Sequence, residues 1–218
     1  MKLKEGDIVA ISSKVVAIHE GATLFAEGVD KRTLVKKHTD WYLEVPSNIH
    51  RTIFTLNKGA IVGSAGIDES NGNDHFILYP SMPFESARIT RKALMKHYGI
   101  KKLGLIITDS MSVPLRRGAI GFALSWDGFQ PLNDYRKKKD LFGRSFKMEL
   151  ANVVDGLSAG AVAVMGEGSE STPLVVIRGA NVTFGNRKQK DSLIVAPEDD
   201  IFAPLFFTGR RWKKGEQA

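Results

Sequence analysis

The sequence predicts an α+β protein with mixed sheets and flanking helices. Strand-like and helix-like segments follow one another irregularly, without the even spacing that a doubly wound parallel sheet requires. The 218 residues are 43% hydrophobic and 25% charged, which provides enough apolar side chains for the core of one or two domains.

Short segments that are rich in apolar residues and bounded by turn residues are predicted to be strands. They are Asp7–Ala17 with a polar break at Ser12–Lys14, Thr52–Leu56, Ala60–Ser64, Phe76–Tyr79, Leu103–Thr108, Ile120–Leu124 and Leu174–Ile177. Asn57–Gly59 joins the second and third strands as a hairpin turn. Pro80 ends the fourth.

Two longer segments have helical periodicity. Pro83–Tyr98 predicts one helix, with basic residues in its last turn and Gly99 as its C-terminal cap. Lys147–Val164 predicts the other, because apolar residues recur at helical spacing until Gly166 ends the pattern.

Composition and charge exclude several classes of protein. With no cysteine, the chain has no disulfide, thiolate metal site or cysteine nucleophile. The first residues lack the apolar stretch of a signal peptide. The longest uncharged apolar stretch, around Leu157–Met165, is far shorter than the roughly 20 residues of a membrane span. We therefore expect a cytoplasmic protein with no membrane partner.

The net charge of +7 and the pI of about 9.5 favour anionic partners such as phosphates. Arg136–Lys139 forms one basic cluster with Arg144 and Lys147, and it is either solvated surface or part of an ordered loop. Arg210–Lys214 forms a second cluster, interpreted as a solvated tail. This tail ends a predicted C-terminal extension, residues 185–218, which follows one larger unit at residues 1–184.

Acidic residues occur at three places where a sheet or loop would present them to solvent. Asp109 and Ser110 follow a predicted buried strand. Asp68 lies in the turn at Gly66–Asn71, and a further acid lies in the glycine-rich loop Met165–Thr172. Mg²⁺ and Mn²⁺ prefer carboxylate and hydroxyl oxygens, so these places together suggest a divalent cation that holds phosphates.

Each place also has a purely structural interpretation. Asp109 could be an N-cap or turn aspartate, and Asp68 could belong to an Asx-turn loop. The glycine-rich loop could wrap phosphates with the unobstructed N–H groups of Gly166 and Gly168, although it lacks the P-loop pattern. The sequence also has no G-x-G-x-x-G, no zinc-spaced histidines and no G-x-S-x-G, which argues against a dinucleotide-binding fold, a zinc site and a serine hydrolase.

Several longer motifs follow one another in a specific order. They are S-A-G-I-D-E-S-N at Ser64–Asn71, T-D-S-x-x-x-P-L-R-R-G-A-I-G-F-A-L at Thr108–Leu124, N-D-Y-R-K-K-K-D-L-F-G-R at Asn133–Arg144, and M-G-E-G followed by P-L-V-V-I-R-G within Met165–Gly179. Together they resemble the coenzyme F420-0:gamma-glutamyl ligase family. Gly6–Gly21 is similar to the first strand of that family.

The resemblance implies an enzyme that joins the α-amine of L-glutamate to the terminal carboxylate of a phosphorylated deazaflavin. It implies GTP, with ATP as the alternative, and a pair of Mg²⁺ or Mn²⁺ ions. Phosphorylation would turn the carboxylate into an acyl phosphate, from which the amine displaces phosphate. The implied fold has two intertwined subdomains, and the implied assembly is a homodimer.

The resemblance also implies roles for individual residues. The implied metal ligands are Asp68, Asp109, Ser110 and Glu167. The implied catalytic residues are Asp109, Arg116 and Arg117. The implied nucleotide-binding residues are Ser13, Lys14, Asn71, Met165, Gly166, Gly168 and Ser169.

Some positions depart from the family pattern. Ile18 replaces a nucleotide-binding lysine, Val113 replaces an arginine suited to an anionic acceptor, and Lys137 stands where glycine is preferred. The family's N-terminal motif P-x-[IVL]-x-x-G-D-D-L precedes the start of this sequence. We therefore expect weaker selectivity for GTP, and an anionic acceptor that is either the deazaflavin or a folate-like pterin.

Two alternatives stay open beside the ligase. One is a non-catalytic nucleotide- or RNA-binding homologue, and the other is a metal-dependent phosphotransferase or phosphatase. The retained Asp68, Asp109 and Glu167 favour an enzyme, and we expect no nucleic-acid partner.

Overall fold

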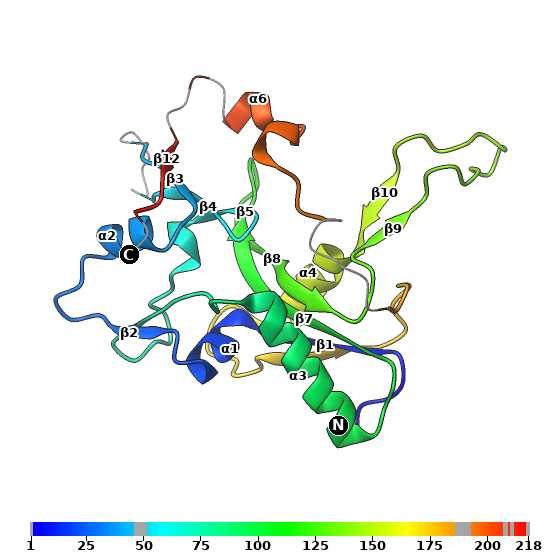
Figure 1. The fold of residues 1–218 in the computed structure, drawn as a ribbon, viewed down its shortest axis with the longest axis horizontal. Coiled ribbons are helices and arrows are strands. Elements are labelled where there is room, and N and C mark those ends of the chain that lie inside the picture. Colours follow the sequence, from blue (N-terminus) through cyan, green and yellow to red (C-terminus); the bar gives the residue numbers. More distant parts are fainter. Residues whose placement is uncertain (1, 46–51, 186–192, 207–208, 210–211, 217–218) are drawn as a thin grey trace. The chain divides into compact units, whose positions relative to one another are not determined.

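The computed structural model describes residues 2–45, 52–185, 193–206, 209 and 212–216 (Figure 1). The chain divides into two compact units, each assembled from three stretches of sequence. The first unit contains residues 1–16, 82–110 and 120–193, and the second contains residues 17–81, 111–119 and 194–218. The predicted α+β class is confirmed, because mixed sheets are combined with few helices.

A four-stranded sheet forms the centre of the first unit. Its strands, in order across the sheet, are β11 (Leu174–Ile177), β1 (Asp7–Ser12), β7 (Leu103–Ser112) and β8 (Ala119–Asp127). β1 runs parallel to β7 and antiparallel to β11. The run Leu105–Ile107 in β7 has no exposed surface, as expected for a strand that is buried on both faces of its sheet.

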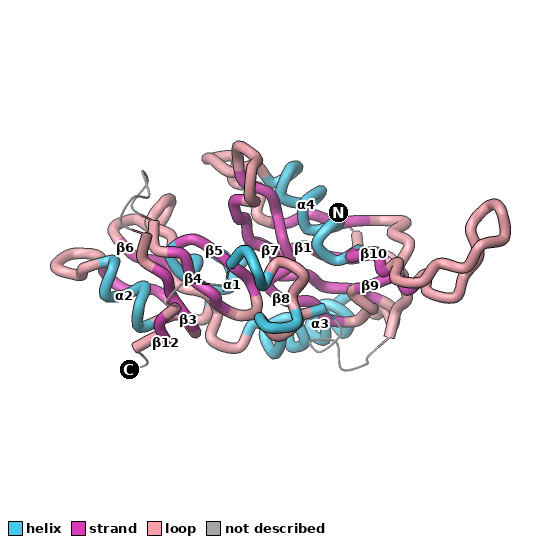
Figure 2. The backbone as a smooth tube through the Cα atoms, turned by 90° about the horizontal axis from the view of Figure 1, so that it is seen from above, coloured by secondary structure: helices cyan, strands magenta, loops and turns pink. Residues whose placement is uncertain are grey.

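Two helices cover the opposite faces of this sheet, as the two backbone views show (Figures 1 and 2). They are α3 (Pro83–Tyr98) and α4 (Val153–Met165). α4 packs very closely on β8 at Gly121, where a Cβ atom would lie 2.5 Å from the carbonyl oxygen of Ser158. Only glycine allows that approach, so Gly121 fixes the distance between helix and sheet.

A long arm extends from the first unit (Figure 2). β9 (Leu132–Asp134) pairs with β10 (Leu150–Asn152), and backbone hydrogen bonds continue the pairing into residues 135–149. Arg136 donates to the Asp134 carboxylate and lowers its pKa to about 2. The basic cluster at Arg136–Lys139 therefore belongs to an ordered loop, which was one of its two interpretations.

The second unit is built on another four-stranded sheet and a shorter strand pair. The sheet order is β12 (Lys213–Lys214), β3 (Trp41–Leu43), β4 (Phe54–Asn57) and β5 (Ala60–Gly63), and the pair is β2 (Thr23–Phe25) with β6 (His75–Ile77). The core of the unit includes Leu34 and Val35 from α2 (Lys31–Lys37) and Tyr42 from β3. The remaining short elements are η1 (Ser64–Gly66), η2 (Pro197–Asp199) and α6 (Ala203–Phe206).

Two predicted elements have different boundaries in the structure. The strand predicted at Asp7–Ala17 ends at Ser12, and α1 (Ser13–His19) follows. Val16 and Ala17 are buried in that helix, so tertiary packing outweighs the β-propensity of the local sequence. The helix predicted from Lys147 begins only at Val153, because the side chain of Asn152 accepts from the Asp155 N–H as an N-cap.

The other predicted elements lie where expected, apart from small shifts at their ends. The Asn57–Gly59 hairpin is confirmed between β4 and β5, and Gly99 adopts the left-handed conformation that ends α3. In the part of the chain that is described, no helix has the length and apolar character to cross a bilayer. The boundary after residue 184 and the dimer stay predictions.

Candidate active site

The carboxyl ends of two parallel strands meet at one edge of the first unit. β1 and β7 pair in register up to Ser12 and Thr108, so the residues after this pair emerge at the same edge. These residues include Ser13 and Lys14 at the start of α1 and Asp109 in β7. Asp109 and Ser110, which the sequence placed after the strand, lie within β7, which continues to Ser112. In open sheets with parallel strands, ligands bind outside this end of the strands.

Ser110 and Glu167 meet at this edge. The Ser110 hydroxyl donates to the Glu167 carboxylate, with 3.2 Å between Oγ and Oε2. The preceding residue on the same face of β7, Thr108, is buried and donates to the carbonyl of Phe122 at 2.9 Å. Glu167 reaches Ser110 because Gly166 ends α4 directly before it. Two predicted metal ligands from distant parts of the sequence are therefore adjacent.

Asp109 lies between Thr108 and Ser110 in β7. Because side chains alternate along a strand, Asp109 projects to the face opposite Thr108 and Ser110. Its side chain is only partly buried. The edge thus presents a carboxylate on one face and a hydroxyl–carboxylate pair on the other.

In the loop that follows α4, backbone N–H groups form hydrogen bonds within the loop and to the end of the helix. The Gly168 N–H donates to the Glu170 carboxylate at 2.8 Å, and the Gly166 N–H donates to the Val162 carbonyl at 2.9 Å. The expectation of two unobstructed N–H groups in this loop is therefore wrong. A Cβ at Gly166 would lie 2.3 Å from the Glu170 carboxyl carbon, and Gly166 has a φ of +81°. Glycine is thus required beneath the Glu170 carboxylate.

Glu170 is the residue of this loop that the sequence analysis missed. Its only signal was a second acid in a glycine-rich loop, and sequence spacing does not show which backbone group a carboxylate accepts from. The loop returns to the strand edge, because the Ser12 N–H donates to the Pro173 carbonyl at 3.0 Å. This hydrogen bond ties the C-terminal end of the loop to the end of β1.

Asp68 lies in a rigid turn of the second unit. Three consecutive residues before it, Ser64, Ala65 and Gly66, have φ between 52° and 72°. Asn57 holds this backbone by donating to the Ala65 carbonyl at 2.9 Å. Such a left-handed run is costly for non-glycine residues and is typical of functional turns.

The Asp68 carboxylate organises the turn that follows it. One of its oxygens, Oδ1, accepts from the N–H groups of Glu69 and Ser70 at 2.7 and 2.8 Å, and both oxygens accept from the Ser70 hydroxyl. The Asx-turn interpretation of Asp68 is therefore confirmed. Asn71, three residues on, is exposed with a φ of 55°.

The two arginines predicted to be catalytic lie in the loop between β7 and β8. Arg116 and Arg117 are exposed, and the Arg116 N–H donates to the Val113 carbonyl at 3.4 Å. This loop belongs to the second unit, whereas Asp109 belongs to the first. The predicted site residues are therefore divided between the two units.

Oxygen donors at the strand edge fit a hard divalent cation. Ser110 and Glu167 form one hydroxyl–carboxylate pair, and Asp109 presents a carboxylate on the other face of β7. Mg²⁺ is commonly bound by one or two carboxylates with water and phosphate. Among the described residues, no three His, Cys, Asp or Glu side chains cluster as a complete protein cage. The donor set therefore suits a cation that shares its coordination with a phosphate.

Comparison with known proteins gives a consistent result. The F420-0:Gamma-glutamyl ligase family matches residues 1–179. A coenzyme F420:L-glutamate ligase of Methanocaldococcus jannaschii is 36% identical over 215 residues, which cover 92% of this chain and 86% of that protein. Proteins of the same name from Methanococcus maripaludis strain C7 and Archaeoglobus fulgidus are 40% and 30% identical, each over 92% of this chain and 86% of the relative.

The match includes both the strand-edge residues of the first unit and the Asp68 turn of the second. It also includes the glycine-rich loop and β11, which completes the central sheet. The chain belongs to the F420-0:gamma-glutamyl ligase family.

Proposed function

We propose that this protein joins L-glutamate to the terminal carboxylate of F420-0 and uses a nucleoside triphosphate and divalent cations to do so. The observation that carries the proposal is the hydrogen bond between Ser110 and Glu167 near the carboxyl end of β7, because ligands of open parallel sheets bind outside this end of the strands. The names of the relatives, which are coenzyme F420:L-glutamate ligases, support the choice of glutamate and acceptor.

A carboxylate is a poor electrophile, so the proposed reaction activates it first. An acceptor carboxylate oxygen attacks the γ-phosphorus of the nucleotide, the bond to the β-phosphate oxygen breaks, and the nucleoside diphosphate leaves. The α-amine of glutamate then attacks the acyl carbon, releases inorganic phosphate and loses a proton as the amide forms. Both steps need the reacting groups held in line, which is the task proposed for the strand edge.

Ser110 and Glu167 would hold one Mg²⁺ or Mn²⁺ ion at this edge, and Asp109 would hold a second on the other face of β7. Asp68, in its own turn of the second unit, stays a proposed metal ligand. Bound at the strand edge, a divalent cation neutralises the negative charge that builds up on the transferred phosphoryl group. The Ser110 hydroxyl can donate to a phosphate oxygen once it is released from Glu167. Ser13 and Lys14 at the start of α1 would contact the nucleotide phosphates from the adjacent strand.

The acceptor and the nucleotide base are the finer parts of the proposal. Val113 cannot form the bidentate hydrogen bonds of an arginine, so Arg116 or Arg117 would have to contact the acceptor's phosphate group. Ile18 is half exposed and offers no charge to a nucleotide, so GTP and ATP should differ little. We also propose that the active form is a homodimer.

The test is a mass-spectrometric assay of glutamate addition to F420-0 and to a folate, side by side, with Mg²⁺ and either GTP or ATP. The proposal expects glutamate-sized mass increases on F420-0, and slower addition in Arg116→Ala or Arg117→Ala. If glutamate were added only to the folate, the acceptor would be a folate-like compound and not the deazaflavin. The absence of addition to either compound, despite tight nucleotide binding, would favour the non-catalytic binding protein.

A further inference from the structure

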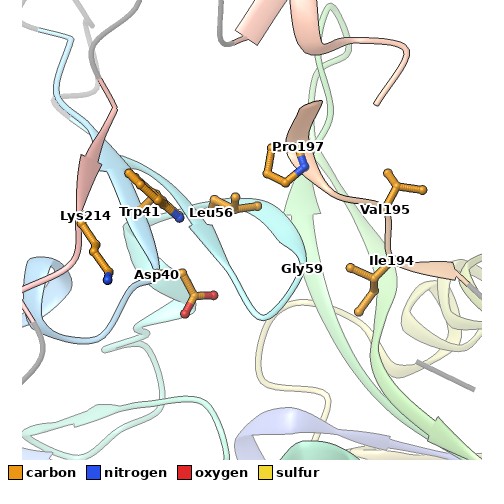
Figure 3. Close-up of a pocket in the computed structure, with 8 residues that line it drawn as sticks. All are labelled: Asp40, Trp41, Leu56, Gly59, Ile194, Val195, Pro197 and Lys214. Atoms are coloured by element: carbon orange, nitrogen blue, oxygen red, sulfur yellow. The ribbon is translucent and has the colours of Figure 1, made fainter. Parts of the chain in front are cut away.

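The second unit contains a pocket that the proposed chemistry does not use. Its volume is about 400 Å³, which is within the range of sites for small molecules. Figure 3 shows Trp41, Asp40 and Lys214 on one side, Ile194, Val195 and Pro197 on the other, and Leu56 between them. All of its lining residues belong to the second unit.

The pocket lies on the face of the β12–β3–β4–β5 sheet that points away from the core. Tyr42 is buried in the core beside α2, and the neighbouring residue Trp41 projects to the opposite face because strand side chains alternate. Trp41 pairs with Leu56 in β4 and with Lys214 in β12, so all three side chains share that face. The register of the sheet thus places an aromatic ring, an aliphatic side chain and a cation together.

Backbone constraints fix the walls of the pocket. The Gly215 N–H donates to the Asp40 carbonyl at 2.9 Å, and a Cβ at Gly215 would lie 1.8 Å from the carbonyl oxygen of Thr39. Across the pocket, Gly59 has a φ of +82°, and a Cβ there would lie 2.7 Å from Ile194. Both walls of the pocket therefore depend on a close approach that only glycine allows.

The lining has three kinds of surface at once. Trp41 is 42% exposed, and an exposed indole face next to aliphatic side chains is a platform for a flat ring. The Asp40 carboxylate accepts from the Lys58 N–H at 3.1 Å and keeps lone pairs for a second donor. Lys214 supplies an exposed positive charge. The complementary ligand is a planar heterocycle with an N–H group at its edge and an anionic substituent.

We propose that this pocket binds the fused heteroaromatic ring of a substrate, with Trp41 stacked on the ring, Asp40 accepting from a ring N–H, and Lys214 facing a phosphate. The proposal rests on the proposed function, because two of its substrates, the phosphorylated deazaflavin and the purine nucleotide, both have this chemistry. Trp41, Asp40 and Lys214 are specificity-determining residues in this account, and none of them belongs to the predicted catalytic set.

The first experiment measures equilibrium binding of F420-0, Mg-GTP and Mg-ATP separately, by titration calorimetry with the full chain. Trp41→Ala should weaken one of the two ligand classes about ten-fold, and Trp41→Phe should retain most of the affinity because it keeps an aromatic face. Phe54→Ala is the matched control, since Phe54 is equally exposed on the same face of β4 but does not line the pocket. Loss of F420-0 binding assigns the pocket to the acceptor, and loss of nucleotide binding assigns it to the purine.

A second variant covers the case in which Trp41→Ala fails to fold. Val195 is 56% exposed on the opposite wall, so Val195→Glu is tolerated by the fold and places a carboxylate in the pocket. It should weaken the same ligand as Trp41→Ala. Unchanged affinity for all three ligands in Val195→Glu and in folded Trp41→Ala would overturn the proposal.

Lys214→Ala tests the anionic substituent. It should weaken F420-0 or nucleotide about three-fold while leaving the corresponding unphosphorylated compound unaffected, with Lys96→Ala on α3 as the control. An equal loss for phosphorylated and unphosphorylated ligands would contradict the role of Lys214. The binding assays also separate this proposal from the proposed function. Binding that depends on Trp41 without any glutamate addition would support the pocket and reject the ligase activity. Glutamate addition with binding that does not depend on Trp41 would reject only the pocket.

Discussion

The two units of the molecule present functional residues in different ways. In the first unit, a sheet buried on both faces ends in polar residues, and Asp109 and Ser110 simply continue a strand whose register is fixed by β1. In the second unit, Asp68 follows a strained turn that Asn57 holds by a hydrogen bond, and its carboxylate accepts from the residues directly after it. The first arrangement depends on the sheet, whereas the second depends on local turn geometry.

The difference also concerns what each unit can bind. The strand edge of the first unit offers carboxylate and hydroxyl oxygens, which suit a hard cation and a phosphate bound to it. The sheet of the second unit offers an exposed tryptophan and aliphatic side chains, which suit a flat ring. A ligase that handles both a triphosphate and a heterocyclic acceptor needs both kinds of surface.

The largest expected effect comes from removing one carboxylate from each unit. Asp109→Asn and Asp68→Asn should each lower kcat for glutamate addition by about a hundred-fold or more, because each removes a carboxylate to which the proposed function assigns a divalent cation. Circular dichroism and thermal unfolding should show an intact fold. Glu149→Gln, an exposed acid on the arm, is the control and should leave turnover unchanged. Full activity of both aspartate variants with saturating Mn²⁺ would reject the assignment.

A smaller effect is expected within the first unit, at the Ser110–Glu167 pair. Ser110→Ala should lower kcat about ten-fold, and Glu167→Gln should lower it further because a charge is lost. Since the two side chains are hydrogen-bonded, the double variant should lose less than the product of the single effects. Strict additivity in this double-mutant cycle would show that the two residues act independently.

The stability of the first unit should depend on pH through the start of β1. Arg178 donates to the buried Asp7 carboxylate through two hydrogen bonds of 2.7 Å, which lowers the pKa of Asp7 below 3.8. The charged form is favoured in the folded state, so this stabilisation is complete above pH 3.8 and is lost as the pH falls through the lower folded pKa.

Asp7→Asn should therefore lower the unfolding midpoint by several degrees at neutral pH, and the gap to the wild type should narrow below pH 3.8. Differential scanning calorimetry over this pH range provides the measurement. A gap that stayed constant down to the lowest pH would show that the ion pair contributes nothing to this dependence. The matched exposed pair, Asp134 with Arg136, should tolerate Asp134→Asn with little change in the midpoint.

The smallest effect is expected in the loop of the first unit. In Glu170→Gln the side chain can still accept from the Gly168 N–H, but it no longer repels a phosphate. Nucleoside triphosphate should therefore bind about three-fold more tightly. Weaker binding in calorimetry would instead show that the Glu170 charge helps to hold the nucleotide.

The sequence predicts the first unit better than the second for a physical reason. The run that ends at Thr108 is continuously apolar because both faces of β7 are covered, and such a pattern is visible without any partner. The strands of the second unit are short, and β12 pairs with β3 across most of the chain's length. Pairing of that kind leaves no local signal, so the sequence predicted the β4–β5 hairpin but not β3, β12 or the pocket.

In the candidate site, too, the sequence did not predict contacts between side chains and backbone. Motifs identified Asp109, Asp68 and the glycine-rich loop, but the closing of that loop by Glu170 depends on a side-chain contact two residues away. The start of α1 was missed because burial of Ala17 outweighs the β-propensity of its neighbours. The residue types at strand ends can be predicted from the sequence, whereas their hydrogen-bond partners cannot.

The most direct test of the central claim follows an oxygen atom from the acceptor to phosphate. F420-0 with heavy oxygen in its terminal carboxylate is incubated with the protein, Mg²⁺, nucleotide and L-glutamate, and the released phosphate is analysed by mass spectrometry. If the carboxylate is activated as an acyl phosphate, each new amide yields one phosphate that carries one heavy oxygen, and Asp109→Asn yields almost none. Amide formation with unlabelled phosphate would contradict the account.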